Sequence, residues 1–250
     1  MAKRQSLQVR SRRGIATLEM HLDGGFLGAD VQASLADAVE EIRLSDEIRV
    51  VVLRSRGRDF CLGGDSDGPR DGIAALASVR VPVIASLQGK VLDEGLELAL
   101  ACDFRLAAAG TRLGLTQLSR GVLPSHGGTQ RLPRLVGRGQ ATRMLLLSEV
   151  VSARQAVRDG LIHEVHDAAR LSRKVAALGR HGAAQGRSMA ARSPVAQKLA
   201  KEALLAAGDL SLAEGLRLEG DLYVLSQSTE DRAEGLAAFR EKRRPKFSGN

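Results

Sequence analysis

The stretch from Val81 to Arg134 constrains the fold more than any other part of this 250-residue chain. It opens with an apolar run at 83–87, which is typical of a buried strand. A polar turn follows, and then an apolar segment at 96–106 whose only acidic residues are Glu97 and Asp103. A strand, a turn and a helix in this order expose backbone N–H groups at the positive end of a helix dipole. The stretch therefore predicts a site for a negatively charged oxygen, with Glu97 one turn into the helix.

Strand and helix signals alternate along the first two thirds of the chain. Hydrophobic periodicity predicts strands at 7–10, 14–22, 49–54, 83–87, 105–108 and 111–115, and helices at 29–44, 139–147 and 153–159. Such alternation is typical of an α/β core. From about Ala183 onward every segment has helical spacing, at 193–207, 211–227 and 228–240. We therefore expect an α/β core over 1–185 and a C-terminal helical module over 186–250.

The composition of the chain restricts the cellular compartments in which we expect the protein. No apolar run reaches the length of about 20 residues that a membrane-spanning helix needs. The N-terminus is basic but lacks a following apolar region, so it does not resemble a secretory signal. A transit peptide is the alternative, although strand-like sequence begins by about Leu7. Cys61 and Cys102 show neither metal-ligand spacing nor a disulfide framework, and we expect two buried thiols and no metal. A cytoplasmic protein fits these features.

The net charge of +8 admits nucleic acid as a partner. However, the basic residues are scattered along the chain. Only one Tyr, no Trp and five Phe are available for stacking on bases. We therefore expect a small polyanion, rather than a nucleic acid, as the main ligand.

Four segments resemble the crotonase superfamily, the enoyl-coenzyme A hydratase/isomerase family, and they occur in the family's order. They are 51–65, which ends in a loop similar to the family's G-x-x-F-x-x-G-x-D, then 81–134, 150–165 and 228–247. The resemblance implies an α/β fold in which repeated ββα units wind into a spiral. It also implies C-terminal helices that pack in homotrimers, which are commonly stacked as hexamers. No cofactor is implied besides the coenzyme A that the substrate carries.

The resemblance places two oxyanion-binding N–H groups on the backbone of Gly64 and Glu94. Here the sequence departs from the family, because Asp93-Glu94-Gly95 replaces three glycines. A turn that requires a positive φ would strain a residue other than glycine. Two carboxylates would also oppose a developing anion, unless they point away or are neutralised. The alternative is that Asp93 simply caps the helix.

The acid/base residues show two further departures. Glu97 matches one of the two glutamates that hydratases of the family use, whereas Gln117 stands where the second is expected. Gln117 can hold a water molecule but cannot transfer a proton near neutral pH. Either a neighbour replaces the second glutamate, or the reaction needs one base only. His126, in place of a small residue, is a candidate proton shuttle, with a packing or surface role as the alternative.

The resemblance also implies where coenzyme A binds. Its phosphates require cations, and the candidates by position are Arg56, Arg58, Lys242, Arg243 and Lys246. The 15 residues between Asp65 and Val81 are about half as many as family members commonly have there. Because that segment normally walls the acyl pocket, we expect a wider pocket.

The sequence therefore predicts an acyl-CoA thioester enzyme of the crotonase type. Enoyl-CoA hydratase is the first candidate. Isomerisation, hydrolysis, ring cleavage or decarboxylation of an acyl-CoA is the alternative that Gln117 favours. A non-catalytic or RNA-binding homologue is the third candidate, which the acidic Asp93-Glu94 pair motivates.

Overall fold

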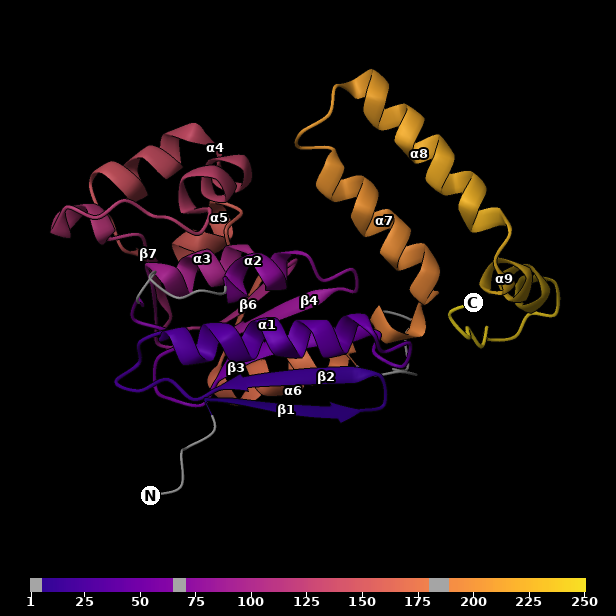
Figure 1. The fold of residues 1–250 in the computed structure, drawn as a ribbon, viewed down its shortest axis with the longest axis horizontal. Coiled ribbons are helices and arrows are strands. Elements are labelled where there is room, and N and C mark those ends of the chain that lie inside the picture. The colour runs from indigo at the N-terminus through magenta and orange to yellow at the C-terminus, as the bar shows by residue number, and fades with distance from the viewer. Residues whose placement is uncertain (1–5, 65–70, 180–188) are drawn as a thin grey trace.

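A six-stranded sheet forms the centre of the computed structural model, which describes residues 6–64, 71–179 and 189–250 (Figure 1). Its order is β1-β2-β3-β4-β6-β9, with β1 antiparallel to β2 and the remaining neighbours parallel. The strands are β1 (Leu7–Arg12), β2 (Ile15–Met20), β3 (Val50–Ser55), β4 (Val83–Leu87), β6 (Phe104–Ala108) and β9 (Glu164–His166).

A second sheet of three short strands lies beside the first. It contains β5 (Lys90–Leu92), β7 (Arg112–Gly114) and β8 (Val151–Ser152), in the order β5-β7-β8. The chain alternates between the sheets, because β4 and β6 belong to the large sheet whereas β5 and β7 belong to the small one. Helix α3 (Glu94–Leu100) follows the first of these strand pairs. This repetition produces the expected spiral of ββα units.

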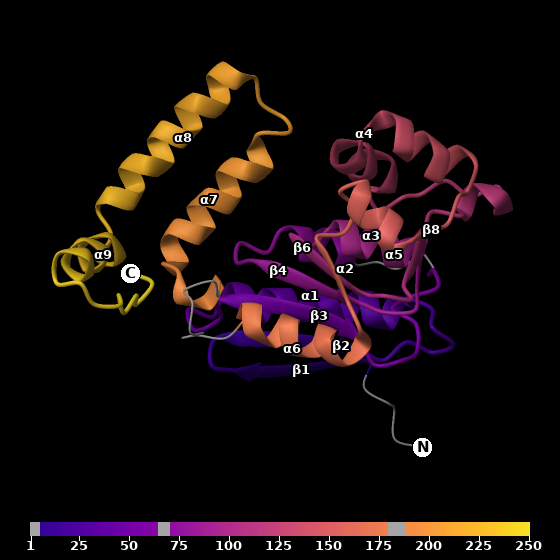
Figure 2. The same cartoon turned by 180° about the vertical axis from the view of Figure 1, so that it is seen from behind.

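Helices cover both faces of the large sheet, because its strands alternate their side chains between two cores. Helices α1 (Ala29–Arg43), α2 (Gly72–Ala77) and α3 lie on one face, and α6 (Ala168–Gly179) lies on the other (Figures 1 and 2). In β3, Val51 and Leu53 join the larger core, whereas Val50 and Val52 pack in the smaller core beneath α6.

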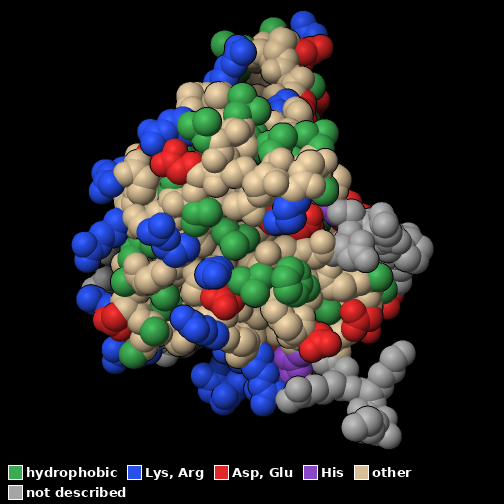
Figure 3. Space-filling view, turned by 90° about the vertical axis from the view of Figure 1, so that its left-hand side faces the viewer, with side chains coloured by type: hydrophobic (Ala, Val, Ile, Leu, Met, Phe, Trp, Pro, Cys, Tyr) green, Lys and Arg blue, Asp and Glu red, His purple; other side chains and the backbone are tan. Residues whose placement is uncertain are grey.

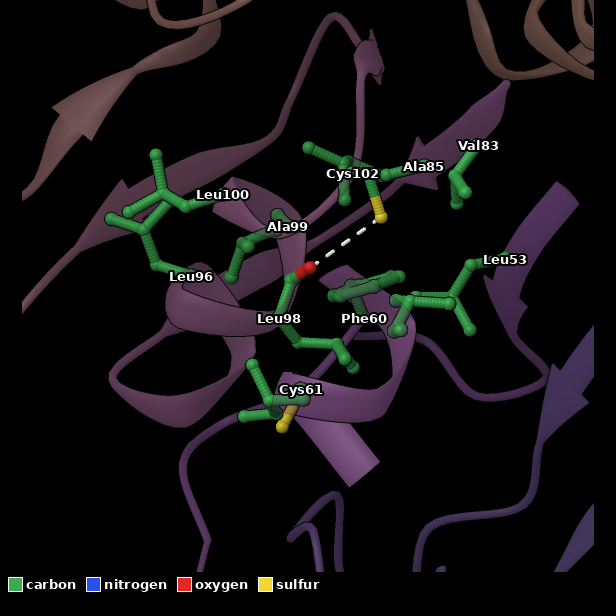
Figure 4. Close-up of a cluster of buried hydrophobic side chains, with 14 of the residues drawn as sticks. Leu53, Phe60, Cys61, Val83, Ala85, Leu96, Leu98, Ala99, Leu100 and Cys102 are labelled. Atoms are coloured by element: carbon green, nitrogen blue, oxygen red, sulfur yellow. Dashed lines mark hydrogen bonds between the residues drawn. The ribbon is translucent and has the colours of Figure 1, made fainter. Parts of the chain in front are cut away.

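Both cysteines belong to the larger core, as expected from the sequence. Figure 4 shows them among the side chains of Leu53, Phe60 and Leu98. The thiol of Cys102 donates a weak hydrogen bond to the carbonyl oxygen of Leu98, at 3.4 Å. Burial raises the pKa of both thiols to about 12, which leaves them unreactive near neutral pH.

Three helices differ from the sequence-based expectation, and one of them, α2, was not predicted. Helix α4 (Gly128–Leu146) begins well before residue 139, in two helical segments that meet at Gly137, where φ is 77°. Its first segment escaped prediction because Pro133 and several glycines weaken the helical pattern. Helix α6 was not predicted at all. Helix α5 (Ala153–Arg158) agrees with expectation.

Three helices close the chain, as predicted: α7 (Pro194–Ala206), α8 (Leu212–Gln227) and α9 (Glu230–Arg240). Helices α7 and α8 form an antiparallel pair that stands beside the α/β core (Figures 1 and 2). The predicted boundary between 185 and 186 lies outside the described residues. None of the helices in the described ranges combines the length and the apolar character that a bilayer crossing requires.

A polar tie at Asp103 connects α7 to the core. One oxygen of the Asp103 carboxylate accepts hydrogen bonds from the backbone N–H of Val83, at 2.7 Å, and from Lys201 Nζ, at 2.6 Å. Lys201 also donates to the carbonyl oxygen of Val81, at 3.0 Å, and is only 9% exposed. Asp103 is thus structural, as its position in the sequence indicated.

Replacing Lys201 by Met should lower the free energy of unfolding by about 1–3 kcal/mol. The carboxylate of Asp103 and the carbonyl oxygen of Val81 then lose the hydrogen-bond donor that they share. Chemical denaturation monitored by circular dichroism measures this change. Lys198→Met, a matched change on the same helix, should have a much smaller effect. Equal effects of the two substitutions would show that the tie contributes nothing specific.

Candidate active site

Glycines bring the two predicted N–H donors together. A Cβ atom at Gly95 would lie 2.6 Å from the Cβ atom of Cys61, so only glycine lets α3 rest on the loop that contains Cys61 and Gly64. A Cβ atom at Gly64 would lie 2.7 Å from the carbonyl oxygen of Leu27 and 3.4 Å from the Cβ atom of Glu94. Gly64 and Glu94 are therefore close neighbours, as the sequence predicted.

The backbone N–H groups of Gly64 and Glu94 remain available to a ligand. Within the described part of the chain, neither group donates to a protein acceptor. Glu94 is the first residue of α3, where the helix dipole is positive. Every residue of α3 is buried, so the donor of Glu94 lies in a water-poor environment, and Gly64 is half-buried. Such a pair can stabilise a negatively charged oxygen.

Asp93 occupies the strained position that the sequence indicated. Its φ is 53° and its ψ is −120°, in a region that residues other than glycine rarely adopt. The carboxylate is 1% exposed and accepts hydrogen bonds from the N–H and hydroxyl groups of Thr116. Arg120 Nη2 also donates to it, at 2.8 Å. The negative charge of Asp93 is thus neutralised, and the alternative that this side chain caps α3 is wrong.

Glu97 is fully buried. Its Oε1 atom accepts hydrogen bonds from the backbone N–H groups of His126, at 2.7 Å, and Gly128, at 2.8 Å. Gln117 Nε2 donates to its Oε2 atom, at 3.3 Å. Burial raises the pKa of Glu97, because the charged form loses its hydration, and the two N–H bonds offset only part of this effect. A carboxylate with a raised pKa is suited to general acid/base chemistry.

Gln117 and His126 both contact Glu97, but in different ways. The side chain of Gln117 is fully buried, and its Oε1 atom has no hydrogen-bond donor among the described residues. His126 contacts Glu97 through its backbone only. Its Nδ1 atom lies 3.1 Å from Ser125 Oγ. Gly127, with φ of 98°, provides the unusual turn that brings them together.

The side chain of Glu94 is a feature that sequence analysis missed. The residue is 4% exposed, and its Oε2 atom is buried without a hydrogen-bond donor in the described ranges. A Cβ atom at Gly63 would lie 3.4 Å from this oxygen. The sequence signal was the glutamate at position 94, where the family has glycine, but the sequence analysis had assigned a role only to the backbone of Glu94.

A hollow of about 890 Å³ opens beside Gly64 and is the candidate substrate groove. Residues of the loop between β2 and α1 and of the start of α1 line it, together with Ser6, Arg56 and Gly57. Arg56 and Arg58 are both exposed and follow β3. Figure 3 shows Lys and Arg side chains along this end of the molecule. Within the described ranges, no group of three or more His, Cys, Asp or Glu residues is placed to hold a metal ion.

The five predicted coenzyme A ligands fall into two groups within one protomer. Arg56 and Arg58 follow the end of β3. The other three, Lys242, Arg243 and Lys246, belong to the C-terminal segment. This segment is held near the start of β3, because Arg49 Nη2 donates a hydrogen bond to the carbonyl oxygen of Phe247, at 3.0 Å. Arg243 is also paired with Glu234, at 2.6 and 2.8 Å. The two groups therefore lie near opposite ends of β3.

Comparisons with known proteins agree with this architecture. The model of the enoyl-CoA hydratase/isomerase family matches residues 26–250. The mitochondrial methylglutaconyl-CoA hydratase of Mus musculus is 35% identical, over 95% of this chain and 80% of that protein. A putative enoyl-CoA hydratase/isomerase of Bacillus subtilis, YngF, is also 35% identical, over 94% of each chain. The crystal structure of enoyl-CoA hydratase from Bacillus anthracis is 31% identical and superimposes with a TM-score of 0.90, over 98% of this chain and all of that one. The chain has the crotonase fold and belongs to the enoyl-CoA hydratase/isomerase family.

Proposed function

We propose that this protein is an acyl-CoA enzyme that adds water across the Cα–Cβ double bond of an enoyl thioester, or catalyses the reverse reaction. The observation that carries the proposal is a buried carboxylate of raised pKa, Glu97, on the same short helix as one of two N–H donors. Neither donor has a protein acceptor among the described residues. The two N–H donors can stabilise negative charge on the thioester oxygen, and the carboxylate can accept a proton from the attacking water. The relatives named as hydratases support the same chemistry.

The polar groups around Glu97 provide a place for the water molecule. As the carboxylate takes one proton from water, the Oε1 atom of Gln117, which has no donor in the described ranges, accepts the other O–H. The water oxygen then bonds to Cβ, and the π electrons move to the thioester oxygen. Gly64 and Glu94 stabilise the resulting enolate through their N–H groups. Loss of one such donor typically costs about 10²–10³ in rate.

Gln117 also favours a second candidate function. A reaction that needs a single base, such as double-bond isomerisation or hydrolysis of an acyl-CoA, is compatible with Glu97 alone. A turnover assay with a panel of enoyl, β-keto and saturated acyl thioesters separates these reactions. Absence of turnover on every thioester would favour the non-catalytic homologue instead.

The exposed apolar side chains of the C-terminal helices support assembly into a homotrimer or a hexamer. On α8, Leu212 is 80% exposed, Val224 67% and Tyr223 62%. Large apolar side chains gathered on one exposed helix usually mark a contact surface. A cytoplasmic location is part of the same proposal and is based on the sequence.

Replacing Glu97 by Gln should lower turnover by about 10²–10⁴, because the amide cannot accept the proton of water. The dissociation constant for the thioester should change little. In the native enzyme kcat/KM should rise with pH through the pKa of Glu97, since the base must be ionised. Because that pKa is raised, the rise should lie above the usual value of about 4.3.

Steady-state kinetics between pH 4 and 9 would show both effects for Glu97→Gln. Glu41→Gln, on the exposed side of α1, is the matched control and should retain native kinetics. Native turnover in Glu97→Gln would remove Glu97 from the mechanism.

Free coenzyme A should compete with substrate, and its binding should weaken as salt rises, because exposed charges are screened over about 10 Å at 0.1 M. Dephospho-coenzyme A should bind more weakly by about 1–3 kcal/mol, since it lacks a charged hydrogen-bonding group. Calorimetric titration of both ligands, at two salt concentrations, measures these differences. Arg56→Met should reduce the salt dependence, whereas Arg138→Met on α4 should not. If neither ligand binds at millimolar concentration, the proposed acyl-CoA function is wrong.

A further inference from the structure

Hydration requires a second proton transfer that Glu97 and Gln117 do not explain. After the water oxygen bonds to Cβ, Cα must receive a proton before the 3-hydroxyacyl thioester is complete. Glu97 is committed to the water molecule, and the amide of Gln117 cannot give up a proton near neutral pH. A second ionisable group beside the two N–H donors would supply this proton while Glu97 stays with the water molecule.

Three buried carboxylates lie around these donors: Asp93, Glu94 and Glu97. Asp93 is paired with Arg120 and hydrogen-bonded to Thr116. Glu97 accepts three hydrogen bonds. Glu94 differs from both, because its Oε2 atom has no donor within the described part of the chain. Buried polar atoms normally have partners, so an unpaired carboxylate oxygen in a site indicates a missing ligand or proton.

Glu94 also lies beside the position proposed for the thioester oxygen. Its own N–H is one of the two proposed oxyanion donors, and Gly64, the other, is so near that an added Cβ atom would lie 3.4 Å from the Cβ atom of Glu94. The thioester oxygen bound between these groups is two bonds from Cα. A glutamate side chain has three rotatable bonds, which is enough to bring its carboxyl group to that carbon. Gly63 leaves space beside the carboxylate.

The charge of Glu94 determines whether its carboxyl group can transfer a proton beside the enolate. A carboxylate beside the enolate oxygen would oppose the anion that the N–H groups stabilise. A Glu94 carboxyl group that gives a proton to Cα relieves this repulsion. When it gives its proton to Cα, the negative charge moves from the enolate oxygen to Glu94, so that two negative charges are never required together.

We propose that the carboxyl group of Glu94 is the second proton-transfer group of this site and delivers the proton to Cα. The inference rests on the proposed hydratase function. Glu97 takes a proton from water as the new C–O bond forms and the π electrons move to the thioester oxygen. The carbonyl then reforms, the Cα–H bond forms and the O–H bond of Glu94 breaks. Glu94 regains a proton from solvent as Glu97 releases one, so that enoyl thioester plus water gives 3-hydroxyacyl thioester.

Two variants of Glu94 test this role against simple obstruction of the site. Glu94→Gln keeps the size of the side chain but removes the transferable proton, and should lower kcat by about 10²–10⁴ with little change in KM. Glu94→Gly removes the side chain altogether and should also lower kcat. If either folded variant equals or exceeds the native enzyme, Glu94 only obstructs or is idle, and the proposal is overturned.

A rescue and an exchange measurement make the test specific. In the Glu94→Gln background, Gln117→Glu should restore part of the lost turnover, because it provides a transferable proton from the other side of Glu97. In deuterium oxide, the native enzyme should exchange the Cα hydrogen of a 3-hydroxyacyl-CoA, and Glu94→Gln should lose this exchange. Exchange at the native rate in Glu94→Gln would contradict the proposal, whatever its turnover.

Two controls separate this inference from the proposed function. Glu41→Gln should match the native enzyme in every assay. Calorimetric binding of coenzyme A and thermal unfolding establish that each Glu94 variant is folded. A native enzyme that processes no thioester overturns the proposed function, and this inference with it. A native hydratase whose Glu94 variants keep full activity overturns this inference alone.

Discussion

The site depends on the contact between Gly95 and Cys61. No side chain separates the two backbones there, so α3 lies directly on the loop that follows β3. That contact fixes the start of α3 beside Gly64, and the donors of both segments then face the same space. A methyl group at Gly95 would overlap Cys61 and push α3 away, together with Glu94 and Glu97. The arrangement of the catalytic candidates thus follows from one close approach between two chain segments.

The neighbouring carboxylates of Asp93 and Glu94, where β5 leads into α3, have different surroundings. Asp93 takes a strained backbone conformation but finds a cation and two donors on the segment after β7. Glu94 has an ordinary helical position but one oxygen without a donor in the described ranges. A protein interior rarely leaves such a group unpaired, because its lost hydration is not replaced. The turn therefore combines a charge that serves the structure with a group that is available for chemistry.

Much of the core could be predicted because the sequence patterns that indicate its strands and helices each span only a few consecutive residues. The strand at β4, the turn that follows it and the helix with Glu97 follow from a few consecutive residues. The other features depend on distant segments. The start of α4 is hidden by Pro133, and the contact between Ser125 and His126 depends on the turn at Gly127. Likewise, the Oε2 atom of Glu94 lies beside Gly63, which is 31 residues away in the sequence.

The tie between Arg49 and the carbonyl oxygen of Phe247 affects more than the C-terminus. It holds the C-terminal cations at the start of β3, away from Arg56 at its other end. If those cations contact the phosphates of a ligand bound to a neighbouring protomer, each ligand molecule bridges two chains. Binding and association are then linked by mass action, and each strengthens the other by the same factor. Dilution of the protein would weaken its hold on coenzyme A even though no residue in the substrate groove had changed.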